Sequence, residues 1–520
     1  MKIYFLVILV FSFKVYGQTG KEPLFSKEEL KHPLKVKELD LSHNRLKVLP
    51  PELIKFKNLE ELDIGENPEL DLSASFEILS RFKSLKFLSL SDLNKPIPDD
   101  ISKLTSLEEL SLGRNDLTSI PEGVKKLTRL RELSLWRNNI STISLQPGDL
   151  PNLEEIEFML NKFTAFPDDL SLLPNLKKIS FYGNQISYVS PGIKKFLRLE
   201  ELTLRGNKLS SLPEEFGELK ALRKLDLREN KLTSIAPLLN LIGLEWLDIG
   251  ENQLTSITPL VNLIGLEELD IAKNKIEEIP ANISILKNLK ELSLYANPIR
   301  VLPGWIRDLP SLNYITIDVN DSAKLPAHLS LLAAMPQLKT LSIYLAGIKE
   351  MPPEFEKLTQ VNKFLIGECD LTKAERKRLR VVFPKASFYF HKSWGDESFY
   401  KYKPCSMNEH DWDTISVDNL KLKYLFVGQS YRHTDNDGIH YWHGRILLNL
   451  DKKTVSKETA ENILIAIADR LQMEDITAVR ACRVYDIMHS AVAPKDEATK
   501  KYYKENLIGI YYRRSGLERY

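Results

Sequence analysis

The chain has few cysteines and almost no net charge, and each shortage excludes a class of protein. Its 520 residues include three cysteines, Cys369, Cys405 and Cys482, whereas an exported domain held together by disulfides would carry more of them, clustered and even in number. One bridge is possible and one thiol is left over, so stability must come from packing. The 72 basic and 71 acidic residues leave a formal net charge of +1. That balance gives no support to nucleic-acid or anionic-membrane binding, which needs a basic face.

Long apolar runs are missing after the first residues of the chain. Lys2 is followed by IYFLVILVFSF, which has the length of a signal-peptide core, and then by small residues at Val15 and Gly17 that suit cleavage. This stretch is too short to span a bilayer. We therefore expect residues 1–17 to be a signal peptide and the protein to be exported to a periplasm, the cell surface or the medium, with no stable membrane anchor in the mature chain. A cytoplasmic protein is the alternative if the segment is not a functional signal.

One pattern, LxxLxLxxN, returns fifteen times along the chain. Its second leucine position recurs at steps of 22 or 23 residues, except for steps of 26 before Leu88 and Leu341. Such a period is interpreted before any local propensity, and the alternating apolar residues predict a short strand with one face inward. The fifteen positions are Leu39, Leu62, Leu88, Leu110, Leu133, Ile156, Ile179, Leu202, Leu225, Leu247, Leu269, Leu292, Ile315, Leu341 and Phe364.

An asparagine follows three residues after the last apolar residue of most of these strands. Buried at a turn, its amide must find partners, and we expect it to bond the backbone of its own and neighbouring coils as a ladder along the array. Leu93, Ala346 and Cys369 replace it in three units, where we expect less regular coils. The ladder residues that we identify are Asn44, Asn115, Asn138, Asn161, Asn184, Asn207, Asn230, Asn252, Asn274 and Asn297.

These units resemble the leucine-rich repeat family with its bacterial-type repeats of 22–23 residues, over about residues 36–390. The resemblance implies an α/β solenoid with a curved parallel sheet on its concave face and short helices or turns outside. Segments that open with proline, such as PEEFGELKAL, predict short helices with proline in the first turn, whereas IAPLLNLIGL and ITPLVNLIGL predict tight turns. We expect an N-terminal cap over residues 18–35. LTKAERKRLRVVFPKASFYF is similar to the closing half-repeat of many bacterial members: a charged helix, a proline break and a last strand.

The variable positions of each strand should face outward on the concave side. In the column that follows the second apolar residue, three large apolar side chains on consecutive coils precede two arginines. Aromatic residues, methionine and arginine are enriched at protein interfaces, so we predict a binding site for a protein partner of unknown identity. The predicted partner-binding residues are Trp136, Met159, Tyr182, Arg205, Arg228 and Trp246.

Charged residues in the neighbouring columns favour a structural interpretation. The column before the strand leucine alternates acid and base from Glu155 to Lys224, and neighbouring opposite charges stabilise adjacent strands. Three aspartates, Asp226, Asp248 and Asp270, line up in the central column. We expect them to be hydrated or balanced by nearby arginines, and we favour this over a bound cation.

The repeat stops near residue 391, and residues 391–520 predict a small α+β domain of unknown role. The stretch YRHTDNDGIHYWHG carries five residues of metal-ligand type, His433, Asp435, Asp437, His440 and His443. However, NDG between two strand patterns indicates a hairpin turn, and residues three apart in a strand point to opposite faces. We therefore predict no metal site, no cofactor and no catalytic residue here.

The sequence as a whole predicts an exported protein-binding module that recognises its partner with the concave face. The alternative is an enzyme with its active site in residues 391–520, for which the repeats serve as a substrate-recognition arm. A purely structural surface protein is a third hypothesis. The Cys-x-Asp nucleophile motif of the cysteine-dependent ubiquitin ligases that follow some bacterial repeat arrays is absent, because Cys405 and Cys482 precede Ser-Met and Arg-Val.

Overall fold

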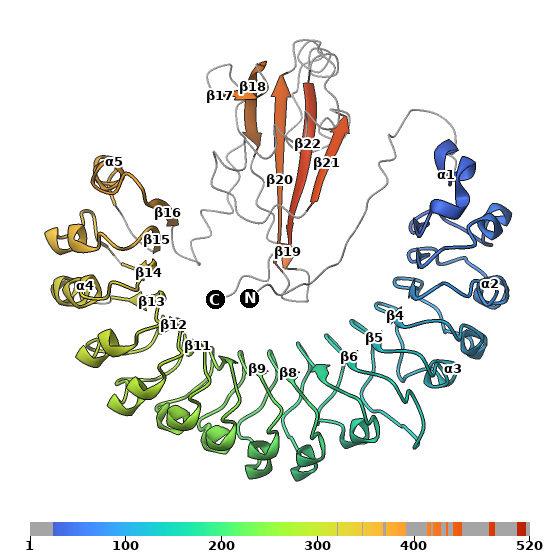
Figure 1. Ribbon diagram of the computed structural model, residues 1–520, viewed down its shortest axis with the longest axis horizontal. Coiled ribbons are helices and arrows are strands. Elements are labelled where there is room, and N and C mark those ends of the chain that lie inside the picture. The colour runs from blue at the N-terminus through green and yellow to red at the C-terminus, as the bar shows by residue number, and fades with distance from the viewer. Residues whose placement is uncertain are drawn as a thin grey trace. The chain divides into compact units, whose positions relative to one another are not determined.

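The computed structural model describes residues 24–319, 321–345, 347–367 and 371–391, together with strands of a second unit between residues 413 and 515 (Figure 1). The chain divides into two compact units, residues 1–393 and 394–520. The predicted signal peptide, residues 1–17, lies outside the described residues. No helix in the described part of the chain is long and apolar enough to cross a membrane.

The first unit is built on one parallel sheet of 16 strands that follow each other in sequence order. The strands line the inner side of a curved array and the helices lie outside it (Figure 1), so the predicted solenoid is confirmed. Strand pairing follows the sequence repeat, as where Leu133 lies opposite Ile156. The strands are β1 Glu38–Asp40, β2 Glu61–Asp63, β3 Phe87–Ser89, β4 Glu109–Ser111, β5 Glu132–Ser134, β6 Glu155–Glu157, β7 Lys178–Ser180, β8 Glu201–Thr203, β9 Lys224–Asp226, β10 Trp246–Asp248, β11 Glu268–Asp270, β12 Glu291–Ser293, β13 Tyr314–Asp318, β14 Thr340–Tyr344, β15 Lys363–Gly367 and β16 Ser387–His391.

The two longest return segments form α-helices of eight and nine residues. The two longest steps of the repeat, before Leu88 and before Leu341, contain the α-helices α2 Leu72–Leu79 and α4 Leu325–Ala333, the second preceded by the short η11 Ser322–Lys324. The shorter, regular steps mostly have room for a single 3-10 helix, and one of them holds the short α3 Glu122–Lys125. The 3-10 helices of the regular steps are η2 Pro51–Lys55, η3 Asp99–Lys103, η4 Asp168–Leu172, η5 Pro191–Lys195, η6 Glu214–Glu218, η7 Ala236–Asn240, η8 Thr258–Asn262, η9 Ala281–Ile285, η10 Gly304–Asp308 and η12 Pro353–Lys357.

Two expectations about these segments were wrong in detail. IAPLLNLIGL and ITPLVNLIGL form η7 and η8, helices of the same kind and length as η6 rather than tight turns, because Leu238 and Leu260 must reach the core as Phe216 does. The proline of PEEFGELKAL stands at the N-cap, not in the first turn. Pro213 has φ −70° and ψ 155° there, and its ring fixes φ close to that value.

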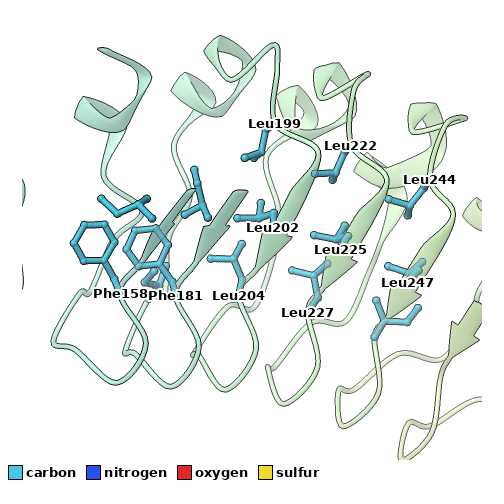
Figure 2. Close-up of a cluster of buried hydrophobic side chains, with 14 of the residues drawn as sticks. Phe158, Phe181, Leu199, Leu202, Leu204, Leu222, Leu225, Leu227, Leu244 and Leu247 are labelled. Atoms are coloured by element: carbon cyan, nitrogen blue, oxygen red, sulfur yellow. The ribbon is translucent and has the colours of Figure 1, made fainter. Parts of the chain in front are cut away.

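One continuous apolar core runs between the sheet and the return segments. Figure 2 shows equivalent leucines stacked from coil to coil, as Leu202, Leu225 and Leu247 are. Phenylalanines fill the wider interior beside them, and the rings of Phe158 and Phe181 stack with centroids 5.2 Å apart. Burying a side chain of this size contributes about 1.5–3 kcal/mol. Each coil therefore depends on its two neighbours for stability.

Both ends of the array are covered. At the first coil, α1 Lys27–Lys31 and η1 Pro33–Lys35 precede β1, and Phe25 packs on Phe56 with ring centroids 5.0 Å apart. At the last coil, α5 Lys373–Val382 leads into β16, where Phe388 stacks on Phe364 at 4.8 Å. These aromatic contacts cover the apolar faces that the terminal coils would otherwise expose.

The second unit contains an antiparallel sheet in the order β17-β18-β20-β22-β21, with β19 paired to β20. The predicted NDG turn lies outside the described residues, as do Asp435 and Asp437. The strands are β17 Asp413–Val417, β18 Leu420–Val427, β19 His433–Thr434, β20 His440–Asn449, β21 Ala478–Arg483 and β22 Leu507–Ser515.

Candidate binding surface on the concave face

Three positions of each coil face outward on the concave side. They are the residue before the strand leucine, the residue after it and the third residue after it, for example Glu132, Ser134 and Trp136 around Leu133. We call these the first, second and third columns. Because the strands pair in parallel and in register, equivalent residues of adjacent coils lie about 4.8 Å apart. The surface is therefore a fixed grid.

The asparagines hold this grid from behind. Asn138 Nδ2 donates to the carbonyl oxygens of Leu112 and Leu135, at 3.0 and 2.9 Å, while its Oδ1 accepts from the backbone N–H groups of Asn115 and Leu117, both at 3.0 Å. One amide thus links its own coil to the preceding one. Asn184 and Asn230 donate in the same way, and the Oδ1 of each accepts from one backbone N–H of the preceding coil, that of Phe163 or Leu209. A buried amide satisfied in this way holds the spacing of adjacent strands.

Two details of the ladder differ from the sequence-based list. Asn44 is exposed, and its Nδ2 donates to Ser42 O at 2.8 Å, because no coil precedes it. Asn67, omitted from that list although it matches the pattern, is fully buried and bonds both its own coil and the first one. At Leu93 a leucine takes the place of the asparagine, and its backbone N–H donates to Asn115 Oδ1 at 2.9 Å.

Trp136 does not project into water as its position alone suggested. Its indole lies against Gly113 of the preceding coil, so closely that a Cβ on Gly113 would be 2.0 Å from Trp136 Nε1. The guanidinium carbon of Arg114 lies 5.8 Å from the centre of the ring. Arg114 is held in turn by Asp92 at 2.8 Å. Because residue 113 is a glycine, there is space for the indole, which lies partly buried on the sheet.

Met159 and Tyr182 continue the third column on β6 and β7, and both are partly buried. The Arg205 guanidinium carbon lies 5.6 Å from the centre of the Tyr182 ring, and Arg205 Nη2 donates to Glu229 at 2.5 Å. We call Trp136, Met159 and Tyr182 the apolar patch. It is bracketed by two arginines that are both fixed by carboxylates, so its geometry is set before any partner arrives.

The structure places Arg228 differently from the prediction. It was expected to present an exposed charge beside the patch, but it is 6% exposed. Its Nη2 donates to Glu251 at 2.6 Å, and its Nη1 lies 3.7 Å from Asp248 Oδ2 and 3.6 Å from Asp270 Oδ2. The carboxylates of the two following coils draw the guanidinium down onto the sheet. Arg228 is thus enclosed by carboxylates of its own protein.

The three aligned aspartates also have structural partners. The backbone N–H groups of Arg228, Gly250 and Ala272 donate to Asp226, Asp248 and Asp270 at 3.0, 2.8 and 2.7 Å. Burial raises the pKa of Asp226 to about 6, and burial together with mutual repulsion raises the pKa of Asp248 well above its ordinary value. Arg228 opposes both shifts. The two predicted explanations were hydration and neutralisation by nearby arginines, and the second therefore applies to these aspartates.

Trp246 does not join the apolar patch. It lies in the first column of β10, partly buried, and β8 and β9 separate it from Tyr182 on β7. Three strand spacings amount to about 14 Å. In the residues between, Lys178, Glu201 and Lys224 form ion pairs across adjacent strands at 3.1 to 4.0 Å, the structural role expected for this column.

The first six strands carry a charge pattern that the sequence-based prediction missed. Their three columns hold eight carboxylates and no lysine or arginine. We call these carboxylates the acidic surface. The first column alone is glutamate at five of these six positions, and its comparison coil by coil would have found the pattern. The eight are Glu38, Asp40, Glu61, Asp63, Glu109, Glu132, Glu155 and Glu157.

Burial, and after it the neighbouring carboxylates, raises several pKa values of the acidic surface. Partial burial and the neighbouring Glu109 and Glu155 raise the pKa of Glu132 to about 7. Burial raises the pKa of Glu157 and, with help from Glu38, that of Glu61. Glu155 has a cation within reach, Lys178 at 3.3 Å. No group of three or more metal-ligating side chains in the described residues is arranged to hold a metal ion.

Comparisons with known proteins bear on the repeats. A family profile described as leucine rich repeat matches residues 197–254 and 264–321. A second, described as leucine rich repeats in two copies, matches residues 35–77, 105–147 and 242–284. No curated protein matches the chain significantly.

Several solved structures are similar to the repeat region. A leucine-rich repeat protein of Leptospira interrogans is 29% identical with a TM-score of 0.57, and the match covers 70% of this chain and 98% of that chain. An internalin of Listeria monocytogenes is 22% identical with a TM-score of 0.45, covering 55% of this chain and 88% of that chain. The ectodomain of the Arabidopsis thaliana receptor kinase GASSHO1, in complex with Casparian strip integrity factor 2, is 22% identical with a TM-score of 0.43. That match covers 68% of this chain and 50% of the ectodomain chain.

Proposed function

Because the chain belongs to the leucine-rich repeat family, we propose that it is a protein-binding module that recognises a protein partner with its concave face. A fold of this kind supplies a rigid, extended surface rather than a reaction centre, and function must be argued from that surface. The proposed role is binding without catalysis. The acidic surface disfavours a nucleic acid as partner, because phosphate groups would meet carboxylates.

The observation that carries the proposal is the apolar patch. Trp136, Met159 and Tyr182 occupy three consecutive coils and remain partly open to solvent. A contiguous apolar patch on a folded surface usually marks an interface. Arg114 and Arg205 hold the two aromatic rings in place, so docking would cost little side-chain ordering entropy. Aromatic anchors of this kind tend to dominate the energy of binding.

Export belongs to the proposal as well. It is supported by the basic residue, apolar stretch and small residues that precede residue 18. The partner would then be an extracellular or cell-envelope protein. Fusion of residues 1–30 to a reporter enzyme that is active only after export tests this part, and a reporter that stays inactive would favour the cytoplasm.

The binding proposal is tested with the full mature chain immobilised as bait against extracellular and envelope proteins of the source organism. Trp136→Ala should weaken capture of a specific protein at least tenfold, about 1.4 kcal/mol. Gly113→Ala keeps the indole but displaces it, and should also weaken capture while changing the melting midpoint little. The matched control is Ile242→Ala, which truncates an apolar side chain 62% exposed on the outer side.

Ile242→Ala should leave both affinity and melting midpoint unchanged. If it weakens capture as much as Trp136→Ala does, the partner does not bind the concave face. If Trp136→Ala lowers the melting midpoint and leaves affinity alone, the patch serves only to cover the sheet.

A further inference from the structure

Most carboxylates of the acidic surface form no ion pair within the described residues, and Glu155, which lies 3.3 Å from Lys178, is the exception. The residues just before its first column are neutralised between coils: Lys37 donates to Glu60 at 2.6 Å, and Lys177 and Arg131 contact Glu154 at 2.7 and 3.2 Å. In the part of the chain that the structure describes, neither Glu109 nor Glu132, on β4 and β5, has a cation within ion-pair distance. Adjacent columns of one sheet therefore differ sharply in their charge balance.

Repulsion accumulates along this surface. In-register pairing places Glu109 opposite Glu132, and Glu132 opposite Glu155, at spacings of about 4.8 Å. Like charges directly opposite each other destabilise a sheet. Partial burial is the largest cause of the raised pKa values of Glu109 and Glu132, and neighbouring carboxylates raise both pKa values further. A ligand that brings positive charge would relieve the repulsion and gain the attraction.

The apolar patch borders these carboxylates. Trp136 stands on the same coil as Glu132, and Met159 on the same coil as Glu155 and Glu157. A ligand that covers both must therefore combine cationic and apolar groups. A lone divalent ion offers no apolar group, and the described residues hold no cluster arranged for one. A phosphate backbone has the wrong charge.

We propose that the acidic surface and the apolar patch together bind a basic, extended segment of the protein partner. Its lysine or arginine side chains lie against Glu109, Glu132 and their neighbours, and its apolar side chains lie on Trp136 and Met159. This inference rests on the proposed function and names the partner's chemistry. The span from β1 to β6 is about 24 Å, which corresponds to about seven residues of extended chain.

A synthetic probe tests the charge requirement without knowledge of the partner. A fluorescently labelled nine-residue peptide of lysine and serine with two central leucines is titrated with the full mature chain, and binding is followed by fluorescence anisotropy. Glu109→Gln/Glu132→Gln should weaken binding at least tenfold. Glu214→Gln/Glu218→Gln makes the same change of net charge on η6 of the outer side and should leave binding unchanged.

Three results would overturn the inference: an equal loss in the η6 control, no loss in the Glu109→Gln/Glu132→Gln variant, or equally tight binding of the same peptide with glutamate in place of lysine. Calcium chloride titrated alone is a further arm, and calcium binding that disappears in the double variant while the peptide still binds would assign the carboxylates to a cation. Raising sodium chloride from 50 to 300 mM should weaken the lysine peptide several-fold, because exposed charge pairs are screened.

Failure of this inference can be told apart from failure of the proposed function by comparing two variants. If Trp136→Ala abolishes capture of the natural partner while Glu109→Gln/Glu132→Gln leaves that capture intact, the concave face is the binding site and the partner segment is not basic. If neither variant affects capture, the binding site lies elsewhere and both proposals are wrong.

Discussion

Strands β4–β6 and β9–β11 share one backbone design and treat charge in opposite ways. In β9–β11 the carboxylates of Asp248, Asp270 and Glu251 surround the guanidinium of Arg228, which is almost fully buried. In β4–β6 the carboxylates of Glu109 and Glu132 stand in register with each other and no arginine or lysine occupies the three columns. The first region neutralises its charges internally, whereas Glu109 and Glu132 of the second have no ion-pair partner within the described residues.

The difference shows how one grid can serve both stability and recognition. A charge enclosed by its own protein is difficult for a partner to reach, because its ion pairs would have to be broken and its burial reversed. A row of unneutralised carboxylates beside partly open aromatic side chains is available at no such cost. The third column decides whether the carboxylates are neutralised within the protein, since it holds arginine in the coil of β9 and glycine or tryptophan in the coils of β4 and β5.

The largest expected effect on stability concerns Arg228 and the buried aspartates that it neutralises. Arg228→Ala removes the cation shared by Asp248 and Asp270 and leaves buried carboxylates unpaired, which costs about 3–5 kcal/mol of unfolding free energy. Because the folded-state pKa values of these aspartates are raised already, the loss should be smaller at pH 5, where they can take up protons, than at pH 8. Urea unfolding at both values measures it. An unchanged midpoint at pH 8 would mean that the buried network does not stabilise the fold.

A smaller loss is expected from the ladder that both regions share. Asn184 donates to the carbonyls of Phe158 and Phe181 and accepts from Phe163 N, so Asn184→Leu leaves buried backbone groups unsatisfied at a cost of about 1–3 kcal/mol. Thermal melts measure this cost. Asn44→Leu is the matched control, because Asn44 is exposed at the end of the ladder and its replacement should have little effect. Equal midpoints for Asn184→Leu and the unaltered protein would contradict the structural role of the ladder.

The smallest effect is a change in pH dependence in the acidic region. Glu132 faces Glu109, Glu155, Glu157 and Lys178, and its pKa is raised from 4.5 to about 7 in the folded protein. The folded state therefore holds a proton that the unfolded state has released, and this stabilising contribution is lost as pH rises from about 4.5 to 7. Glu132→Gln should lose less stability than the unaltered protein between pH 5 and pH 8. If the melting midpoints of the two proteins change equally with pH across that range, the pKa of Glu132 is not raised in the folded protein.

The sequence predicted the backbone far better than the surface. Strands β1–β15 pair along the fifteen aligned positions, because a regular period leaves each coil one way to bury its leucines against the next. The helix type of the return segments was harder to predict, since IAPLLNLIGL contains little local signal and η7 forms because Leu238 must reach the core. Among the predicted binding residues, the structure brings Trp136, Met159 and Tyr182 together, while Trp246 lies three strands away and Arg228 is enclosed.

The sequence by itself therefore determined which residues form the sheet and which asparagines line its turns, because both follow from a repeated pattern of apolar and amide side chains. Only the tertiary structure decided how each outward side chain lies. Trp136 rests against Gly113 of the preceding coil, and Arg228 is drawn toward Asp248 and Asp270 on the two coils that follow it. The surroundings of a side chain on this surface are set by the coils on either side, and the local sequence does not contain them.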